Sequence, residues 1–189
     1  MYQWKSAIVF IVLLTLIGCG KEETEQIICY SLTQSDLPGV SIEFPHQSCD
    51  YTIEQAQLGF YVDYIVKINE TITDVIPRAL DTGDCEKPGP SGLVIHYQFG
   101  DDPYVYCQCN TQLCTNEPLA TVTLEPGEFA SHVWVQARQW QGPSDTNEMP
   151  GDPFPVGEYD VILVAEGVEG VALKAWPFHI IGRYQVRLH

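Results

Sequence analysis

The most reactive side chains in this sequence are cysteine thiols, and Cys107, Cys109 and Cys114 stand close together with the spacing C-x-C-x₄-C. Thiolates at such a spacing could hold a soft metal ion, or the thiols could be oxidised in pairs to disulfides. Structural zinc sites use four ligands and commonly the C-x₂-C spacing, and copper(I) needs thiols that stay reduced. The pattern therefore favours disulfides and predicts neither a metal site nor a cofactor, with a thiolate metal site as the alternative.

Six cysteines are available for pairing, because the chain has seven and Cys19 has a separate role given below. An even number in an exported chain indicates a disulfide framework. Neighbours at i and i+2 point to the same face of a strand, so Cys107 and Cys109 are expected to reach different partners. The predicted pairs are Cys29 with Cys49, Cys85 with Cys107, and Cys109 with Cys114.

No pattern for catalysis is present. The five histidines fall in separate segments without an H-E-x-x-H pair, and Ser91 stands in G-P-S-G without a nucleophile elbow. Asp145, Asn147, Glu148 and Asp152 form an acidic group in one loop, but their spacing does not match an EF-hand, so calcium is only an alternative reading. The sequence predicts a protein that is not an enzyme.

Residues 1–18 have the pattern of a signal peptide. Lys5 precedes an apolar run from Ala7 to Ile17, which only Thr15 interrupts. A helix of that length would be about 16 Å long, roughly half of the ~30 Å hydrocarbon core of a bilayer. This segment is therefore expected to target the chain for export and not to span a membrane.

Leu16-Ile17-Gly18-Cys19 resembles the lipobox of bacterial lipoproteins. The resemblance implies cleavage before Cys19 and acylation of that cysteine, so the predicted partner is a lipid bilayer. More than one acyl chain gives stable anchoring. Gly20, in place of the aspartate that retains lipoproteins at the inner membrane, favours the outer membrane. Residues 19–27 then form the lipidated N-terminus and a short polar tether.

The charge of the chain restricts its partners. Acidic residues number 25 against 9 lysines and arginines, for a net charge of -16. Such a surface is repelled by phosphate backbones, so nucleic acid is excluded as a partner.

Short strands must position these groups, because turn residues punctuate the chain at regular short intervals. Phe60 to Ile68 alternates apolar and polar side chains, as a half-buried strand does. A weak helical pattern covers Thr52 to Leu58, and a turn is expected at E-G-V-E-G, residues 166–170. The other expected strands are Leu93–Phe99 paired with Tyr104–Cys107, then Ala120–Leu124, Phe129–Trp140, Tyr159–Ala165 and Val171–Ile180. Residues 28–189 are expected to form a single all-β domain.

Two motifs carry a resemblance to a known family. L-E-P-G-E at 124–128 and F-P-V-G-E-Y at 154–159 flank a tryptophan-bearing strand and a loop rich in glycine and proline. This arrangement resembles the Ig-like domain of the bacterial intracellular proteinase inhibitor family, over about residues 55–181. The resemblance implies an Ig-like or fibronectin-like antiparallel β-sandwich, here stapled by disulfides, and assigns no inhibitory residue.

These observations predict a cell-envelope lipoprotein that acts as a non-enzymatic binding or structural module, with an envelope protein or glycan as partner. The candidate binding surface is the long loop of residues 141–155 with its aromatic borders, because loops on a rigid scaffold commonly carry function. Its candidate residues are Trp140, Asp145, Asn147, Glu148, Asp152 and Phe154. The alternatives are an envelope protease inhibitor acting through an exposed loop and, last, an enzyme or metal-binding protein on the same scaffold.

Overall fold

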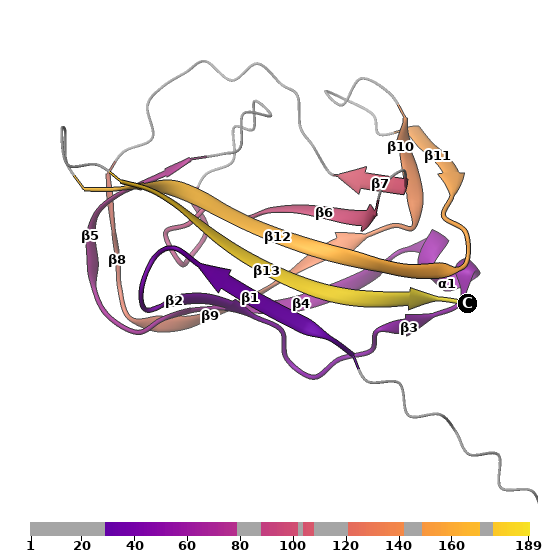
Figure 1. The fold of residues 1–189 in the computed structure, drawn as a ribbon, viewed down its shortest axis with the longest axis horizontal. Helices are drawn as coiled ribbons and strands as arrows, with labels where there is room; N and C mark the ends of the chain where they lie inside the picture. The colour runs from indigo at the N-terminus through magenta and orange to yellow at the C-terminus, as the bar shows by residue number, and fades with distance from the viewer. Residues whose placement is uncertain (1–28, 79–87, 102–103, 108–120, 142–148, 171–175) are drawn as a thin grey trace, which may run out of the picture.

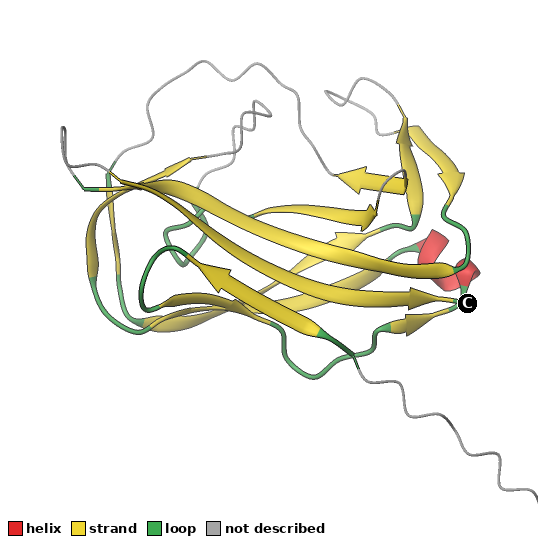
Figure 2. Cartoon of the chain, in the orientation of Figure 1, coloured by secondary structure: helices red, strands yellow, loops and turns green. Residues whose placement is uncertain are grey.

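The computed structural model describes residues 29–78, 88–101, 104–107, 121–141, 149–170 and 176–189. The predicted leader, Cys19 and the tether lie outside these ranges. Within them, the helical element is α1 (Ile53–Leu58), and no described helix has the length and apolar character needed to cross a bilayer. The remaining regular structure is β-strand (Figures 1 and 2).

Two sheets, antiparallel except for the short parallel pair of β3 with β13, make up most of the described chain, and a separate two-stranded ribbon accompanies them. The larger sheet has the strand order β1-β13-β12-β5-β8; β6 also pairs with β12, β7 pairs with β6, and β3 pairs with β13. The smaller sheet has the order β2-β4-β9, and β10 pairs with β11. The larger sheet consists of β1 (Ser31–Ser35), β3 (Asp50–Tyr51), β5 (Ile72–Arg78), β6 (His96–Asp101), β7 (Tyr104–Cys107), β8 (Val122–Leu124), β12 (Gly157–Glu169) and β13 (Trp176–Leu188). The other strands are β2 (Val40–Glu43), β4 (Phe60–Ile68), β9 (Gly127–Val135), β10 (Arg138–Gln141) and β11 (Met149–Pro153).

The core lies between the two sheets and is built from alternate residues of each strand. In β4 the predicted alternation is confirmed: every second side chain from Phe60 to Ile68 is buried, whereas Tyr61 and Asp63 are exposed. A strand with period two buries one face only, which requires a second sheet to cover it. Buried partners from both sheets include Val62, Val66, Val133, Val135, Phe99, Val161, Leu163, Ile180 and Val186. The prediction of an all-β fold with packed antiparallel sheets is therefore confirmed.

The longest hairpin joins β12 to β13 and corrects one prediction. The two strands pair continuously from Gly157 opposite Leu188 to Glu169 opposite Trp176. The expected turn at E-G-V-E-G is wrong, because residues 166–169 continue β12. Gly167 permits this course, since a Cβ there would lie 2.6 Å from the Phe178 ring and 2.7 Å from the backbone oxygen of Ile76.

The segment expected as one strand from Phe129 to Trp140 is instead two strands in different sheets. It divides after Val135, and Ala137 lies between β9 and β10 with its side chain buried. The Ala137 N–H donates to the Ala56 carbonyl, and the Ala137 carbonyl accepts from the Phe154 N–H, 2.9 Å in each case. These bonds satisfy the buried backbone where the chain leaves β9.

Helix α1 was the weakest expected element, and it is confirmed. Thr52 caps its N-terminus: the Thr52 hydroxyl accepts from the Gln55 N–H, and the Gln55 side chain accepts from the Thr52 N–H. The helix ends at Gly59, whose φ of 98° and ψ of 153° are available almost only to glycine. Gly59 leads directly into β4 and therefore sets where that strand begins.

Candidate functional site

The predicted loop surface lies only partly within the described residues. Its two ends are the ribbon of β10 and β11, in which Arg138 pairs with Pro153 and Gln141 with Met149. The backbone of Trp140 is in β10, and Asp152 is exposed in β11. Asp145, Asn147 and Glu148 lie outside the described residues. Their prediction as binding residues stays a prediction.

Phe154, the C-terminal border of that loop, belongs to the core. Its side chain is 1% exposed and stacks on Phe99 with ring centroids 5.4 Å apart. Tyr159 packs against both rings and donates its hydroxyl proton to the Pro155 carbonyl at 2.9 Å. A tyrosine that bonds the backbone four residues upstream has the geometry of the tyrosine corner of Greek-key sandwiches. Within F-P-V-G-E-Y, these two aromatic residues therefore fix the start of β12.

Only some of the cysteines lie within the described residues. The predicted Cys29–Cys49 disulfide is confirmed, with the two Cα atoms 5.6 Å apart. It fastens the start of the described chain to the segment before β3. Cys85, Cys109 and Cys114 lie outside the described residues, and Cys107 is described only by its place in β7. Among the described side chains, no three histidine, cysteine or acidic groups gather closely enough to hold a metal ion.

A surface that the sequence did not single out is the outward face of β4 and β9. Tyr61 and Trp134 lie opposite each other, and His132 lies opposite Asp63. The Tyr61 ring contacts both His132 and Trp134 edge-on, with centroids 4.8 Å apart in each pair. Tyr61 is 57% exposed and Trp134 37% exposed. We call Tyr61, His132 and Trp134, with the neighbouring Leu58 at 78% exposure, the aromatic patch.

Trp134 is held firmly although it faces solvent. A Cβ at Gly59 would lie 2.0 Å from the indole ring, so the ring rests directly on the backbone of this glycine. The Trp134 carbonyl accepts a hydrogen bond of 2.5 Å from the Tyr97 hydroxyl, which reaches across from the larger sheet. Three contacts therefore fix the exposed indole: the Gly59 backbone beneath the ring, the Tyr61 ring beside it, and the Tyr97 hydroxyl on the Trp134 carbonyl.

Charged residues lie along the same face at the other end of β4. Lys67 bridges Glu43 at 2.8 Å and Glu128 at 3.6 Å. The hydrogen bond and charge of Glu43, with a smaller contribution from Glu128, raise the pKa of the Lys67 ammonium above its ordinary value. One cation serves two carboxylates here, and Asp63 adds another acidic group beside the aromatic patch. The carboxylates of this face are therefore Glu43 and Glu128 around Lys67 at one end and Asp63 beside the aromatic patch at the other.

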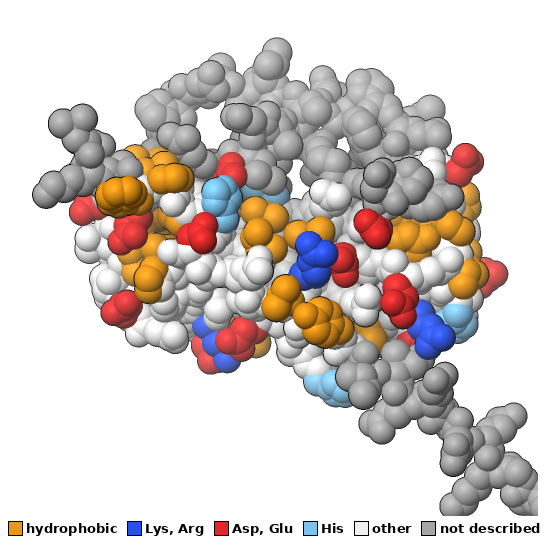
Figure 3. Space-filling model, viewed as in Figure 1, with side chains coloured by type: hydrophobic (Ala, Val, Ile, Leu, Met, Phe, Trp, Pro, Cys, Tyr) orange, Lys and Arg blue, Asp and Glu red, His pale blue; other side chains and the backbone are white. Residues whose placement is uncertain are grey.

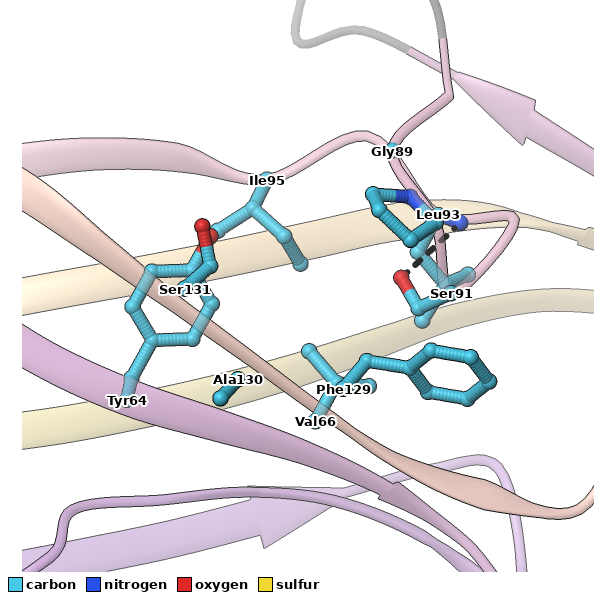
Figure 4. Close-up of a pocket in the computed structure, with 10 residues that line it drawn as sticks. Tyr64, Val66, Gly89, Ser91, Leu93, Ile95, Phe129, Ala130 and Ser131 are labelled. Atoms are coloured by element: carbon cyan, nitrogen blue, oxygen red, sulfur yellow. Dashed lines mark hydrogen bonds between the residues drawn. The ribbon is translucent and has the colours of Figure 1, made fainter.

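A small hollow opens beside the same strand, between β9 and the segment that precedes β6. It has a volume of about 140 Å³. Figure 4 shows Tyr64 and Val66 of β4 on one side and Leu93 and Ile95 on the other, with Ser131 between Tyr64 and Ile95. The Ser91 hydroxyl accepts from the Leu93 N–H at 3.3 Å and thereby holds the turn that forms one wall (Figure 4). We call this space the β9 hollow; its full lining is Tyr64, Val66, Gly89, Pro90, Ser91, Leu93, Ile95, Phe129, Ala130 and Ser131.

Comparisons with protein-family models, with curated proteins and with solved structures each find no match to this chain.

The sequence contains part of the information that locates the aromatic patch. The alternation of residues 129–140 places His132 and Trp134 on the polar face of their strand, and β4 shows the same for Tyr61. Each residue alone is an ordinary exposed aromatic side chain. Only the register of β4 against β9, which lies about seventy residues downstream, brings the three rings into contact.

Proposed function

We propose that this chain is a non-enzymatic binding module of the cell envelope, anchored through acylated Cys19, that binds a protein partner with the aromatic patch. The observation that carries the proposal is Trp134, an exposed indole whose position is fixed by Gly59, Tyr61 and Tyr97. A fixed exposed ring loses little conformational freedom on binding, which is a property of binding hot spots. We further propose the Ig-like arrangement of strands, which the Tyr159 corner supports.

A protein partner fits the patch better than a glycan does. Sugars stack on ring faces, and a row of rings in one plane suits a polysaccharide. The Tyr61 ring is inclined by 60° to Trp134 and by 80° to His132, so the three rings form no common plane. Leu58, the most exposed apolar side chain of the patch, offers aliphatic contact. Exposed tryptophan, tyrosine and aliphatic groups together are typical of protein interfaces.

The disulfide supports the envelope location. Cys29–Cys49 pairs two thiols, and such pairing persists outside the reducing cytoplasm. The described domain begins at Cys29, ten residues after the proposed anchor at Cys19. A tether of that length reaches at most about 35 Å when extended. The domain would therefore act close to the membrane surface.

The anchor is tested by metabolic labelling with radioactive palmitate and by cell fractionation. We expect label on the wild-type protein and none on Cys19→Ala, which should leave the membrane fraction. A labelled Cys19→Ala variant, or an unlabelled wild-type protein in the cytosol with reduced Cys29 and Cys49, would contradict the proposal.

The patch is tested by site-specific crosslinking in whole cells. A photoreactive phenylalanine analogue at Tyr61 should capture a defined protein, whereas the same analogue at Tyr30, which is similarly exposed and immediately precedes β1, should not. Trp134→Ala should abolish the crosslink at Tyr61, and the matched variant Trp176→Ala, which removes an exposed tryptophan on β13, should retain it. Capture of glycan in place of protein would refute the partner class. Unchanged capture in Trp134→Ala would refute the patch.

The protease-inhibitor alternative is separated by a direct assay. An inhibitor titrates its protease stoichiometrically, so purified protein would be added to a panel of envelope proteases. We expect no titration, and a loop-dependent stoichiometric end point would favour the alternative.

A further inference from the structure

Strand β9, which carries His132 and Trp134 of the aromatic patch, is an edge strand of the smaller sheet. Within the described ranges β9 pairs with β4 on one side, and no strand pairs with its other edge. An open edge presents unpaired backbone N–H and C=O groups that can accept another strand.

Two contacts show toward which side the backbone N–H and C=O groups of β9 point. Asp63 turns its N–H and C=O away from β9 to the Gln47 side chain, at 2.8 Å each, so its opposite residue His132 does not exchange hydrogen bonds with β4. The Trp134 carbonyl likewise points outward, to Tyr97. Because direction alternates along a strand, the N–H and C=O groups of Ala130 and His132 face the open edge.

The β9 hollow lies directly under this edge. Ala130 and Ser131 of β9 line it together with side chains of β4 and of the segment before β6, among them Val66, Leu93 and Ile95 (Figure 4). Its volume of about 140 Å³ is close to that of cavities of ~150 Å³ that hold a benzene-sized group, so one branched aliphatic side chain fits. A strand placed along β9 would direct alternate side chains toward this hollow and the others toward the outward face.

The charged residues near β9 indicate which side chains an added strand should carry on its outward face. The outward face of the smaller sheet carries Asp63 and, toward the other end of β4, Glu43 and Glu128, which share Lys67. The whole chain has a net charge of -16, and the face over β12 and β13, which Figure 3 shows, also carries acidic side chains at more places than basic ones. A cationic side chain beside His132 and Trp134 would meet an aromatic ring and the exposed Asp63 opposite His132, on a chain that is acidic as a whole.

We propose that β9 binds an extended peptide segment of the partner protein as an added strand, with an aliphatic side chain in the β9 hollow and basic side chains on the outward face. This inference rests on the proposed function and names the segment that the aromatic patch recognises. Backbone hydrogen bonds to Ala130 and His132 would supply affinity, and the hollow would supply specificity.

The first test uses a blocked nine-residue peptide in which threonine and lysine alternate around a central valine, titrated into the isotope-labelled protein. Amide exchange at Ala130 and His132, whose N–H groups face the open edge, should slow at least tenfold on binding. Exchange at Ser131 and Val133, whose N–H groups face β4, should not change. Alanine in place of the valine should weaken binding about tenfold, since two methyl groups leave the hollow. Glutamate in place of the lysines should weaken it further. Binding without protection at Ala130 and His132 would overturn the proposal.

The second test changes the backbone on both sides. N-methylation of successive peptide amides should alternate between a loss of at least tenfold and little effect, because alternate amides face β9. Ala130→Pro removes the outward N–H and leaves the pairing with β4, so it should lose the peptide, whereas Ala130→Val should bind. If Ala130→Pro does not fold, the N-methyl series decides alone. A uniform N-methyl series would refute strand addition.

The same variant separates this inference from the proposed function. If both hold, Ala130→Pro also removes the crosslink from Tyr61 in cells. If that crosslink persists in folded Ala130→Pro but is lost in Trp134→Ala, the patch binds the partner without strand addition, and only the further inference fails.

Discussion

The substitution Gly59→Ala tests how the fold fixes the aromatic patch. Gly59 has φ 98° and ψ 153°, a backbone region that costs other residues about 1–3 kcal/mol. The new Cβ would also lie 2.0 Å from the Trp134 ring, so the indole must retreat by more than 1 Å before ordinary contact at 3.4 Å is restored. Both effects arise at the junction of α1 and β4.

The expected loss of stability is about 2–4 kcal/mol, because the backbone strain is added to the loss of packing around the indole. For a domain of this size, that corresponds to a fall in Tm of roughly 5–15 °C. Gly39→Ala is the matched control: its φ of 77° is also positive, but its Cβ would meet only the Glu70 and Asn69 side chains, at 3.4 Å or more. Gly39→Ala should therefore destabilise the protein without moving Trp134.

Fluorine NMR of protein labelled with fluorotryptophan reports the indole directly. We expect the Trp134 resonance to shift or broaden in Gly59→Ala and to stay in place in Gly39→Ala, with Trp176 unchanged in both. Crosslinking from Tyr61 should fall along with the Trp134 signal. An unmoved Trp134 resonance in a folded Gly59→Ala protein would refute the claim that this glycine positions the ring.

Three further predictions concern stability. Replacing Cys29 and Cys49 together by serine should lower the free energy of unfolding by about 3 kcal/mol, because the bond closes a loop between residues separated by 20 positions; equal urea midpoints for the two proteins would contradict this. Tyr159→Phe should cost about 1–2 kcal/mol by leaving the Pro155 carbonyl without its 2.9 Å bond, and a midpoint within error of wild type would show that the corner contributes nothing. Burial, followed by the charge of a neighbouring tyrosine, raises the pKa of Tyr184 from 10.0 to about 12; this side chain is 2% exposed. Because the folded pKa lies above the unfolded one, the contribution of Tyr184 to the free energy of unfolding is complete below pH 10. It is lost between pH 10 and 12, at about 1.4 kcal/mol per pH unit. The free energy of unfolding of Tyr184→Phe should therefore fall less steeply with alkaline pH than that of the wild type.

The sequence predicted those features that depend on neighbouring residues. The period-two pattern of β4 was enough to locate the strand and its buried face, because burial alternates along any strand that covers a core on one side. Thr52 and Gln55 form a capping box, a local motif, and the helix that follows is present. The Cys29–Cys49 pair was also predicted, although spacing alone left other pairings open.

Features that depend on contacts between distant segments were decided by the tertiary structure. E-G-V-E-G has the composition of a turn, yet Gly167 lies within β12 because Phe178 and the backbone of β5 approach it too closely for a side chain. Phe154 borders a long loop in the sequence but packs in the core against Phe99.

The candidate site depends most strongly on such contacts. Tyr61 and Trp134 are each exposed aromatic residues in their own strands, and their identities do not indicate that they meet. Pairing register between strands is set by long-range packing, and a shift of one residue would turn every side chain to the other face. The residue types were therefore determined by the sequence, whereas their gathering beside an open strand edge follows only from how β4 and β9 pair.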